Sequence, residues 1–173
     1  MIKDTDIKLK ITPILEDKEG RISSSRIRDL LEKSDLKNAV KILNRPYSFN
    51  GKVVKGKGIG KSIGWPTANL EIDGRKFLPG EGVYAAWTTI ENSNKKIESI
   101  MNLGSQPTIN PSLPSAVEVH LINKDIDLYG LNLSVEPVEK LRSQIKFNNV
   151  KQLSSQIKND RENALNVFKH YKK

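Results

Sequence analysis

The spacing of apolar residues divides the chain into three parts, the first of which is helical. Apolar side chains recur at helical spacing at Ile27, Leu30, Leu31, Ala39, Val40 and Leu43. The serines at 23–25 and the carboxylate of Asp35 stand where helix N-caps are expected. Asn44-Arg45-Pro46 ends the second helix, because the residue before a proline avoids helical backbone angles. The pattern therefore predicts two short helices after a polar lead-in.

From residue 48 the hydrophobic period changes to two. Six segments alternate between apolar and polar residues, at 49–55, 67–72, 83–91, 97–103, 116–122 and 133–141. Residues typical of turns separate these segments, and none of the connections has a helical pattern. A succession of strands without intervening helices favours an antiparallel barrel or sandwich.

The last part, residues 149–171, returns to helical spacing. Its apolar side chains form one face, made by Val150, Leu153, Ile157, Ala164 and Phe168. Asn148 or Asn149 is the expected N-cap. We expect this C-terminal helix to pack against the barrel.

Composition excludes several classes of protein. At 173 residues and 36% hydrophobic content the chain can build one sizeable core. No segment is apolar for long enough to cross a bilayer, and the first residues lack the apolar core of a signal peptide. The absence of cysteine removes thiolate chemistry and cysteine-bound zinc, and only two histidines disfavour a histidine-rich metal site. These features are compatible with a cytoplasmic protein.

The formal net charge of +9 raises the possibility of nucleic-acid binding. The lysines are scattered along the whole chain, and closely spaced aromatic residues for base stacking are missing. A solvated lysine surface that attracts an anionic substrate such as ATP is the favoured interpretation. A small basic barrel that binds RNA or DNA remains an alternative.

A basic, glycine-rich run carries the first chemical signal. It contains Gly56, Gly58, Gly60, Lys61 and Gly64, and glycines let a backbone approach phosphate closely. It is not a Walker A loop, because only three residues separate its first glycine from the Gly-Lys-Ser triplet. A dinucleotide fingerprint is also excluded, since no glycine follows Gly58 at the third position. A glycine-rich hairpin without a ligand is the structural alternative.

The next residues, Pro66-Thr67-Ala68-Asn69, add a metal hypothesis. Thr67 and Asn69 are two residues apart at the start of a predicted strand, so their side chains point to the same side. They offer two neutral oxygen ligands beside the glycine-rich loop. Magnesium carried by ATP prefers such ligands, because it keeps part of its shell on phosphate and water.

Two further groups could take part in chemistry. Glu118 and His120 share one face of the strand at 116–122, and a carboxylate between apolar neighbours could be a general base or simply a solvent-facing glutamate. Arg142 and Phe147 follow the last strand and could cover a planar ligand. They could equally be a surface charge and a core aromatic residue.

Taken together, these segments resemble the riboflavin kinase family, in particular the C-terminal kinase module of bacterial bifunctional riboflavin kinase/FAD synthetases. The resemblance runs from about residue 47 to about residue 168. It rests on the order and spacing of short motifs, at 51–56, 64–70, 82–85, 102–104, 107–108, 118–120, 127–130, 141–142 and 147. Trp65 departs from the motif, where phenylalanine or another apolar residue is more common.

The resemblance implies a mainly β fold, a six-stranded antiparallel Greek-key barrel with a C-terminal helix and a short N-terminal helical segment. It implies transfer of the ATP γ-phosphate to the 5′-hydroxyl of riboflavin, giving FMN, with Mg²⁺. Thr67 and Asn69 match the metal-binding pair, Glu118 matches the catalytic base, and Arg142 and Phe147 fall in the flavin-covering region. The implied ATP site comprises Gly56, Gly58, Gly60, Lys61, Gly64, Pro66, Thr67, His120 and Tyr129. A regulatory module that binds flavin or nucleotide without turnover is an alternative.

The segment 22–28 resembles the motif that closes the adenylyltransferase module of the same bifunctional enzymes. The rest of that module, including a His-x-Gly-His-type motif, is missing from this sequence. We expect residues 1–45 to be a remnant of it and residues 46–173 to be the kinase barrel with its helix. FMN adenylylation is then absent from this chain, and the missing module belongs to a longer protein. An ordinary serine N-cap with surface arginines also explains the segment.

Overall fold

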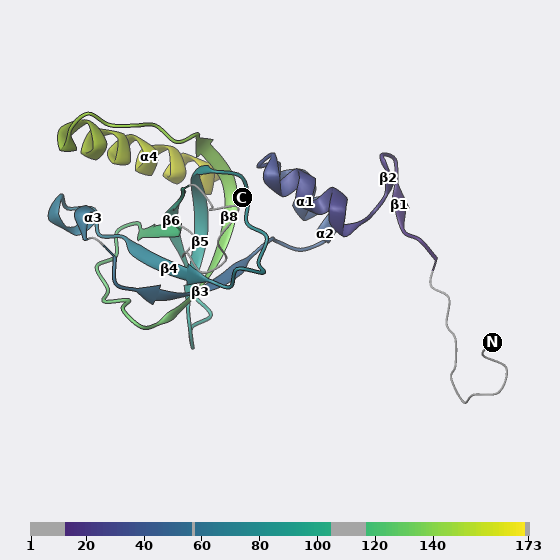
Figure 1. Ribbon diagram of the computed structural model, residues 1–173, viewed down its shortest axis with the longest axis horizontal. Coiled ribbons are helices and arrows are strands. Elements are labelled where there is room, and N and C mark those ends of the chain that lie inside the picture. Colours follow the sequence, from purple (N-terminus) through teal and green to yellow (C-terminus); the bar gives the residue numbers. More distant parts are fainter. Residues whose placement is uncertain (1–12, 57, 105–116, 172–173) are drawn as a thin grey trace.

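The computed structural model describes residues 13–56, 58–104 and 117–171. Its centre is a closed barrel of six antiparallel strands (Figure 1). The strands are β3 (Phe49–Val54), β4 (Ala68–Ile72), β5 (Gly82–Ile90), β6 (Lys96–Leu103), β7 (Val117–Leu121) and β8 (Asn132–Arg142). Around the barrel they follow the order β3-β4-β7-β6-β5-β8. Because β8 returns to lie beside β5, the last four strands form a Greek key, which confirms the predicted fold class.

The period-two alternation appears in the structure as inward and outward side chains. In β4, Ala68, Leu70 and Ile72 are buried in the barrel, whereas Asn69 and Glu71 between them face outward. The predicted strand bounds agree with the structure to within one or two residues. Residue 116, the predicted start of the fifth strand, and the motif residues 107–108 lie outside the described residues.

The C-terminal helix α4 (Val150–Tyr171) packs on the outside of the barrel. Asn149 is its cap: the Asn149 side chain accepts from the Gln152 backbone N–H at 2.9 Å. Ala164 and Phe168 are buried with outward-facing residues of β5 and β6, as predicted. The predicted burial of Val150 is wrong, since its side chain is 56% exposed. The first turn of α4 faces the segment 63–65 across an open groove instead of the sheet.

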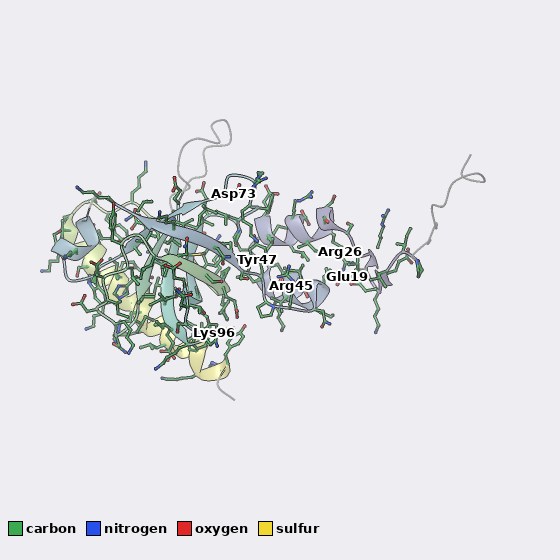
Figure 2. All side chains as sticks on the ribbon, turned by 90° about the horizontal axis from the view of Figure 1, so that it is seen from below. Glu19, Arg26, Arg45, Tyr47, Asp73 and Lys96 are labelled. Carbon is green, nitrogen blue, oxygen red and sulfur yellow. The ribbon has the colours of Figure 1, made fainter. Side chains whose placement is uncertain are left out.

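The helices α1 (Ser24–Glu32) and α2 (Leu36–Leu43) close one end of the barrel. The predicted caps are confirmed, because Ser23 accepts from the Arg26 N–H and Asp35 accepts from the Asn38 N–H. Side chains of both helices join the main barrel core, namely Leu31, Leu36 and Ala39. Tyr47 lies where the helices meet the barrel (Figure 2). The division between residues 45 and 46 stays a prediction.

Two small elements were not predicted. The strands β1 (Glu16–Asp17) and β2 (Gly20–Arg21) form a hairpin too short and too polar to show a period. The Arg26 side chain binds Asp17 and Glu19 of this hairpin, at the end of α1 away from the barrel (Figure 2). In the glycine-rich run, one turn of helix, α3 (Ile59–Ser62), replaces the expected hairpin. Among the described residues, no helix is long and apolar enough to span a bilayer.

Candidate active site

The neighbouring strands β4 and β7 bring three predicted site residues together. Asn69 pairs directly with Glu118 in the β4–β7 register. Thr67, one residue before β4, donates a hydrogen bond from its hydroxyl Oγ1 to Glu118 Oε2 at 3.4 Å. Their neighbours Ala68 and Val119 are buried in the barrel, so these three side chains share its outer face. The predicted metal pair and the predicted base are therefore adjacent, and their roles stay predictions.

Two glycines pack directly against this group. A Cβ atom at Gly56 would lie 2.0 Å from the Asn69 side-chain nitrogen. One at Gly60 would lie 2.3 Å from the Trp65 carbonyl oxygen and 3.1 Å from Thr67 Oγ1. Only glycine permits these approaches. The glycine-rich run thus lies directly over the Thr67 and Asn69 side chains.

A cleft of about 540 Å³ opens beside the pair. Six of the predicted ATP-binding residues line it, namely Gly56, Gly58, Lys61, Pro66, Thr67 and Tyr129. Its opposite wall is the β7–β8 connection, residues 124–129, in which Ile126 and Tyr129 are 44% and 68% exposed. Of the residues in this wall, only Tyr129 was predicted to take part in the site. Their position facing the glycine-rich run follows from the β4–β7 pairing, which no local pattern reveals.

Three predicted ATP-binding residues do not line the cleft. The His120 ring is 9% exposed, and its Nδ1 lies 2.8 Å from the Pro66 carbonyl oxygen. His120 therefore contacts the backbone of the loop and does not line the cleft. Gly60 packs against the Trp65 backbone, and Gly64 ends the turn with a φ of +82°. A direct contact of any of them with ATP stays a prediction.

The predicted flavin-binding residues lie elsewhere on the outer surface. The Arg142 guanidinium binds both carboxylate oxygens of the buried Asp160 on α4, at 2.8 to 3.1 Å. Its Cζ is 5.9 Å from the centre of the Phe147 ring. Neither Arg142 nor Phe147 lines the cleft.

The strand register nevertheless connects Arg142 to the group formed by Asn69 and Glu118. Successive Cα partners run from Asn69 through Glu118, Asn102 and Val83 to Arg142, across β4, β7, β6, β5 and β8. Asn102 stands between the predicted base and the predicted flavin region, and its side-chain oxygen accepts from Gln144 Nε2 at 2.7 Å. The motif at 102–104 belongs to the family resemblance, but no local pattern pointed to a role for Asn102.

The donor set suits a hard cation that arrives with phosphate. Within the described residues, no group of three or more histidine, aspartate or glutamate side chains could hold a metal by itself. Thr67 and Asn69 supply neutral oxygens, and in the described part of the chain no hydrogen bond occupies the Asn69 amide. A magnesium ion keeps several water or phosphate ligands, so two neutral side-chain oxygens, with the Glu118 carboxylate nearby, fit it.

Comparison with known proteins identifies the family. The sequence model described as "Flavokinase: Riboflavin kinase" matches residues 43–168. The chain belongs to the riboflavin kinase family. The bifunctional riboflavin kinase/FMN adenylyltransferase of Bacillus subtilis is 34% identical over all of this chain and 55% of its own length. The protein of the same name from Haemophilus influenzae is 38% identical over 86% of this chain and 47% of its own length. The chain thus spans about half the length of these relatives.

Solved structures agree with this family fold. A crystal structure described as a macrolide-efflux protein from Streptococcus pneumoniae matches with a TM-score of 0.80 and 34% identity, over 90% of this chain and 50% of that one. The riboflavin kinase of Trypanosoma brucei matches with a TM-score of 0.51 and 21% identity, over 72% of this chain and 78% of that one. At that identity the second likeness concerns the fold alone.

Proposed function

We propose that this chain transfers the γ-phosphate of ATP to the 5′-hydroxyl of riboflavin, giving FMN and ADP. One observation carries the proposal. The side chains of Thr67, Asn69 and Glu118 meet on one face, at the edge of a cleft bordered by a glycine-rich loop. Phosphoryl transfer depends mainly on positioning and on charge neutralisation, which such a group provides.

The cleft supplies the nucleotide site of the proposal. Lys61 and backbone N–H groups of the glycine-rich run would bind the phosphates. Apolar side chains deeper in the cleft, including Leu121 and Leu128, suit the faces of a purine base. Tyr129 would contact the nucleotide from the opposite wall.

Magnesium completes the proposal. Thr67 Oγ1 and Asn69 Oδ1 would hold the ion beside the phosphates. When bound, the ion supplies positive charge that offsets the negative charge of the phosphate oxygens. The cleft itself contributes little cationic charge besides lysines at its rim, such as Lys61 and Lys124.

Glu118 would be the general base. Its carboxylate would accept the proton of the riboflavin 5′-hydroxyl as that oxygen forms its bond to the γ-phosphorus. The bond from the γ-phosphorus to the oxygen of the β-phosphate breaks, and ADP leaves with that electron pair. The flavin ring would lie toward Asn102 and Arg142, further along the same row of strand partners, and toward Phe147, which follows β8.

Incubation with riboflavin, ATP and magnesium, followed by chromatography of the flavins, tests the proposal. We expect FMN and no FAD. Glu118→Gln should lower turnover by about 10²- to 10⁴-fold with a KM for ATP within a few-fold, because the base acts on the hydroxyl and not on nucleotide binding. Glu71→Gln, an exposed carboxylate two residues beyond Asn69, is the matched control.

Near-normal turnover in Glu118→Gln would reject the base assignment. Riboflavin left unchanged by the wild-type chain, together with nucleotide binding, would instead support a binding module. Salt-dependent binding of nucleic acid without any response to ATP or riboflavin would support the basic-barrel alternative.

A further inference from the structure

Trp65 joins the glycine-rich loop to the C-terminal helix. Its indole N–H donates a hydrogen bond to Ser154 Oγ on α4 at 3.0 Å, across 89 positions of sequence. Both side chains are half-buried. The hydrogen bond spans a groove of about 600 Å³ between the segment 63–65 and the first turns of α4. Because this groove is open, the loop is not held to α4 by continuous packing.

Trp65 is also held on its other sides. Its ring and the His120 ring pack in a T-shaped arrangement, with centroids 5.5 Å apart and an interplanar angle of 74°. The same histidine contacts the Pro66 carbonyl oxygen through Nδ1 at 2.8 Å. The Trp65 backbone N–H donates to the Gly60 carbonyl oxygen at 2.8 Å. Thus α4, β7 and α3 all meet at the residue that precedes Pro66 and Thr67.

We propose that Trp65 is a positioning residue for nucleotide binding, and that its hydrogen bond to Ser154 holds the segment 58–67 in the conformation that receives the ATP phosphates. This inference rests on the proposed kinase function. Lys61 and Gly64 are exposed, so the loop gains little order from burial. An anchor at Trp65 orders the loop before ATP binds, so less conformational entropy is lost on nucleotide binding. A neutral hydrogen bond of this kind corresponds to about a fivefold change in affinity.

Kinetics of single variants tests the anchor. Trp65→Phe and Ser154→Ala should each raise the KM for ATP about fivefold, the effect expected for one neutral hydrogen bond. The kcat and the KM for riboflavin should stay near wild type. The double variant should match either single one, because all three lack the same hydrogen bond. Ser154→Thr keeps a hydroxyl and should restore the KM, and Ser155→Ala on the same helix is the matched control.

A binding measurement separates this inference from the proposed reaction. The chain has two tryptophans, and Trp87 lies against Phe168 on the far part of α4. In a Trp87→Phe background the emission of Trp65 alone reports titration with ATP and magnesium. Ser154→Ala should weaken that binding about fivefold, whereas Ser155→Ala should not.

If riboflavin is not phosphorylated but Ser154→Ala still weakens ATP binding, the proposed function fails and the anchor stands. If FMN forms and Ser154→Ala behaves as Ser155→Ala in both measurements, the anchor is overturned and the function stands. Additive effects in the double variant would also overturn the anchor. A chain with neither FMN formation nor an emission response to ATP would overturn both.

Discussion

At the scale of single residues, close backbone approach decides how the candidate metal pair is held. Gly56 covers the Asn69 amide so tightly that a methyl group has no room there. The β4–β7 register then sets Asn69 opposite Glu118. The position of the Asn69 side chain therefore depends on Gly56, because any side chain at residue 56 would displace the amide.

Gly56→Ala should impair the reaction through Asn69. The added methyl group would overlap the amide nitrogen and displace the Asn69 side chain from its place beside Thr67. We expect a higher magnesium concentration for half-maximal FMN formation. We also expect about a tenfold loss of kcat/KM, because the Asn69 side chain is no longer in position to bind the ion. Gly20→Ala adds a Cβ that meets nothing within 4 Å and is strained only through its φ of +106°, so it controls for general destabilisation without contact with Asn69. An unchanged magnesium titration in Gly56→Ala would contradict this account.

Tyr47 shows how burial of one hydroxyl changes the response to pH. Its hydroxyl donates to the Phe77 carbonyl oxygen at the junction of helices and barrel. Desolvation by burial raises its pKa to about 12. The folded state thus favours the protonated form, so its contribution to stability is complete below pH 10. That contribution is lost as the pH rises from 10 through 12.

Tyr47→Phe should therefore be less stable than wild type at pH 8, by about 1 kcal/mol for the lost hydrogen bond. Above pH 10 the difference should shrink, by up to about 1.4 kcal/mol per pH unit, because only the wild type ionises this tyrosine on unfolding. Urea denaturation of both proteins at pH 8, 10 and 11 measures the difference. A constant gap across this range would show that Tyr47 does not titrate on unfolding.

At the scale of elements, the end of β8 is tied to α4 by an ion pair. The Asp160 side chain is 3% exposed and binds Arg142 through both oxygens, while Gln156 donates a further hydrogen bond to it. By contrast, Arg75 and Asp73 form a pair within one turn on the surface, with side chains 92% and 56% exposed. The Arg75 hydrogen bond lowers the pKa of Asp73 to about 2, but water screens this exposed pair.

Asp160→Asn should lower the free energy of unfolding by about 3 kcal/mol, because it leaves the half-buried Arg142 without its counter-charge. Asp73→Asn should change it by less than about 0.5 kcal/mol. Chemical denaturation at pH 7 compares the two variants. Equal effects would mean that the Arg142–Asp160 pair contributes no more than a surface contact.

At the scale of the whole molecule, the N-terminal helices and the barrel share one core. Leu31 is 2% exposed and lies in the same cluster as Phe49 and Val135 of the barrel. The Gly80 backbone N–H donates to the Leu31 carbonyl oxygen at 3.0 Å, and Ser34 Oγ lies 2.7 Å from the Tyr84 hydroxyl. The first helices therefore form one end wall of the barrel core.

Leu31→Ala should destabilise the whole protein by about 2–5 kcal/mol, the usual result of a cavity in a packed core. Because the core is shared, helix and strand signals should be lost in one transition. During urea denaturation, circular dichroism would follow the helices, and the combined emission of Trp65 and Trp87 would follow the barrel. Leu15→Ala, at a side chain that is 69% exposed, should have little effect. Separate transitions would show that the helices and the barrel are independent.

Local patterns predicted much of this molecule. Alternating residues located six strands, and serine, aspartate and asparagine caps located three helix starts, because both signals lie within a few neighbouring residues. The adjacency of Thr67 and Asn69 also follows from strand geometry. The hairpin at 16–21 and the turn α3 escaped prediction, since elements of two or four residues are too short to show a period.

By itself, the sequence determined the order of strands and helices, which side of each strand faces inward, and the family to which the motifs belong. The tertiary structure alone decided that Asn69 faces Glu118, that residues 124–129 form a cleft wall, that Arg142 pairs with Asp160 and that Trp65 binds Ser154. The physical reason is the range of the interactions. Periodicity and caps act between residues a few positions apart, whereas each of these contacts joins segments that only barrel closure and helix packing bring together.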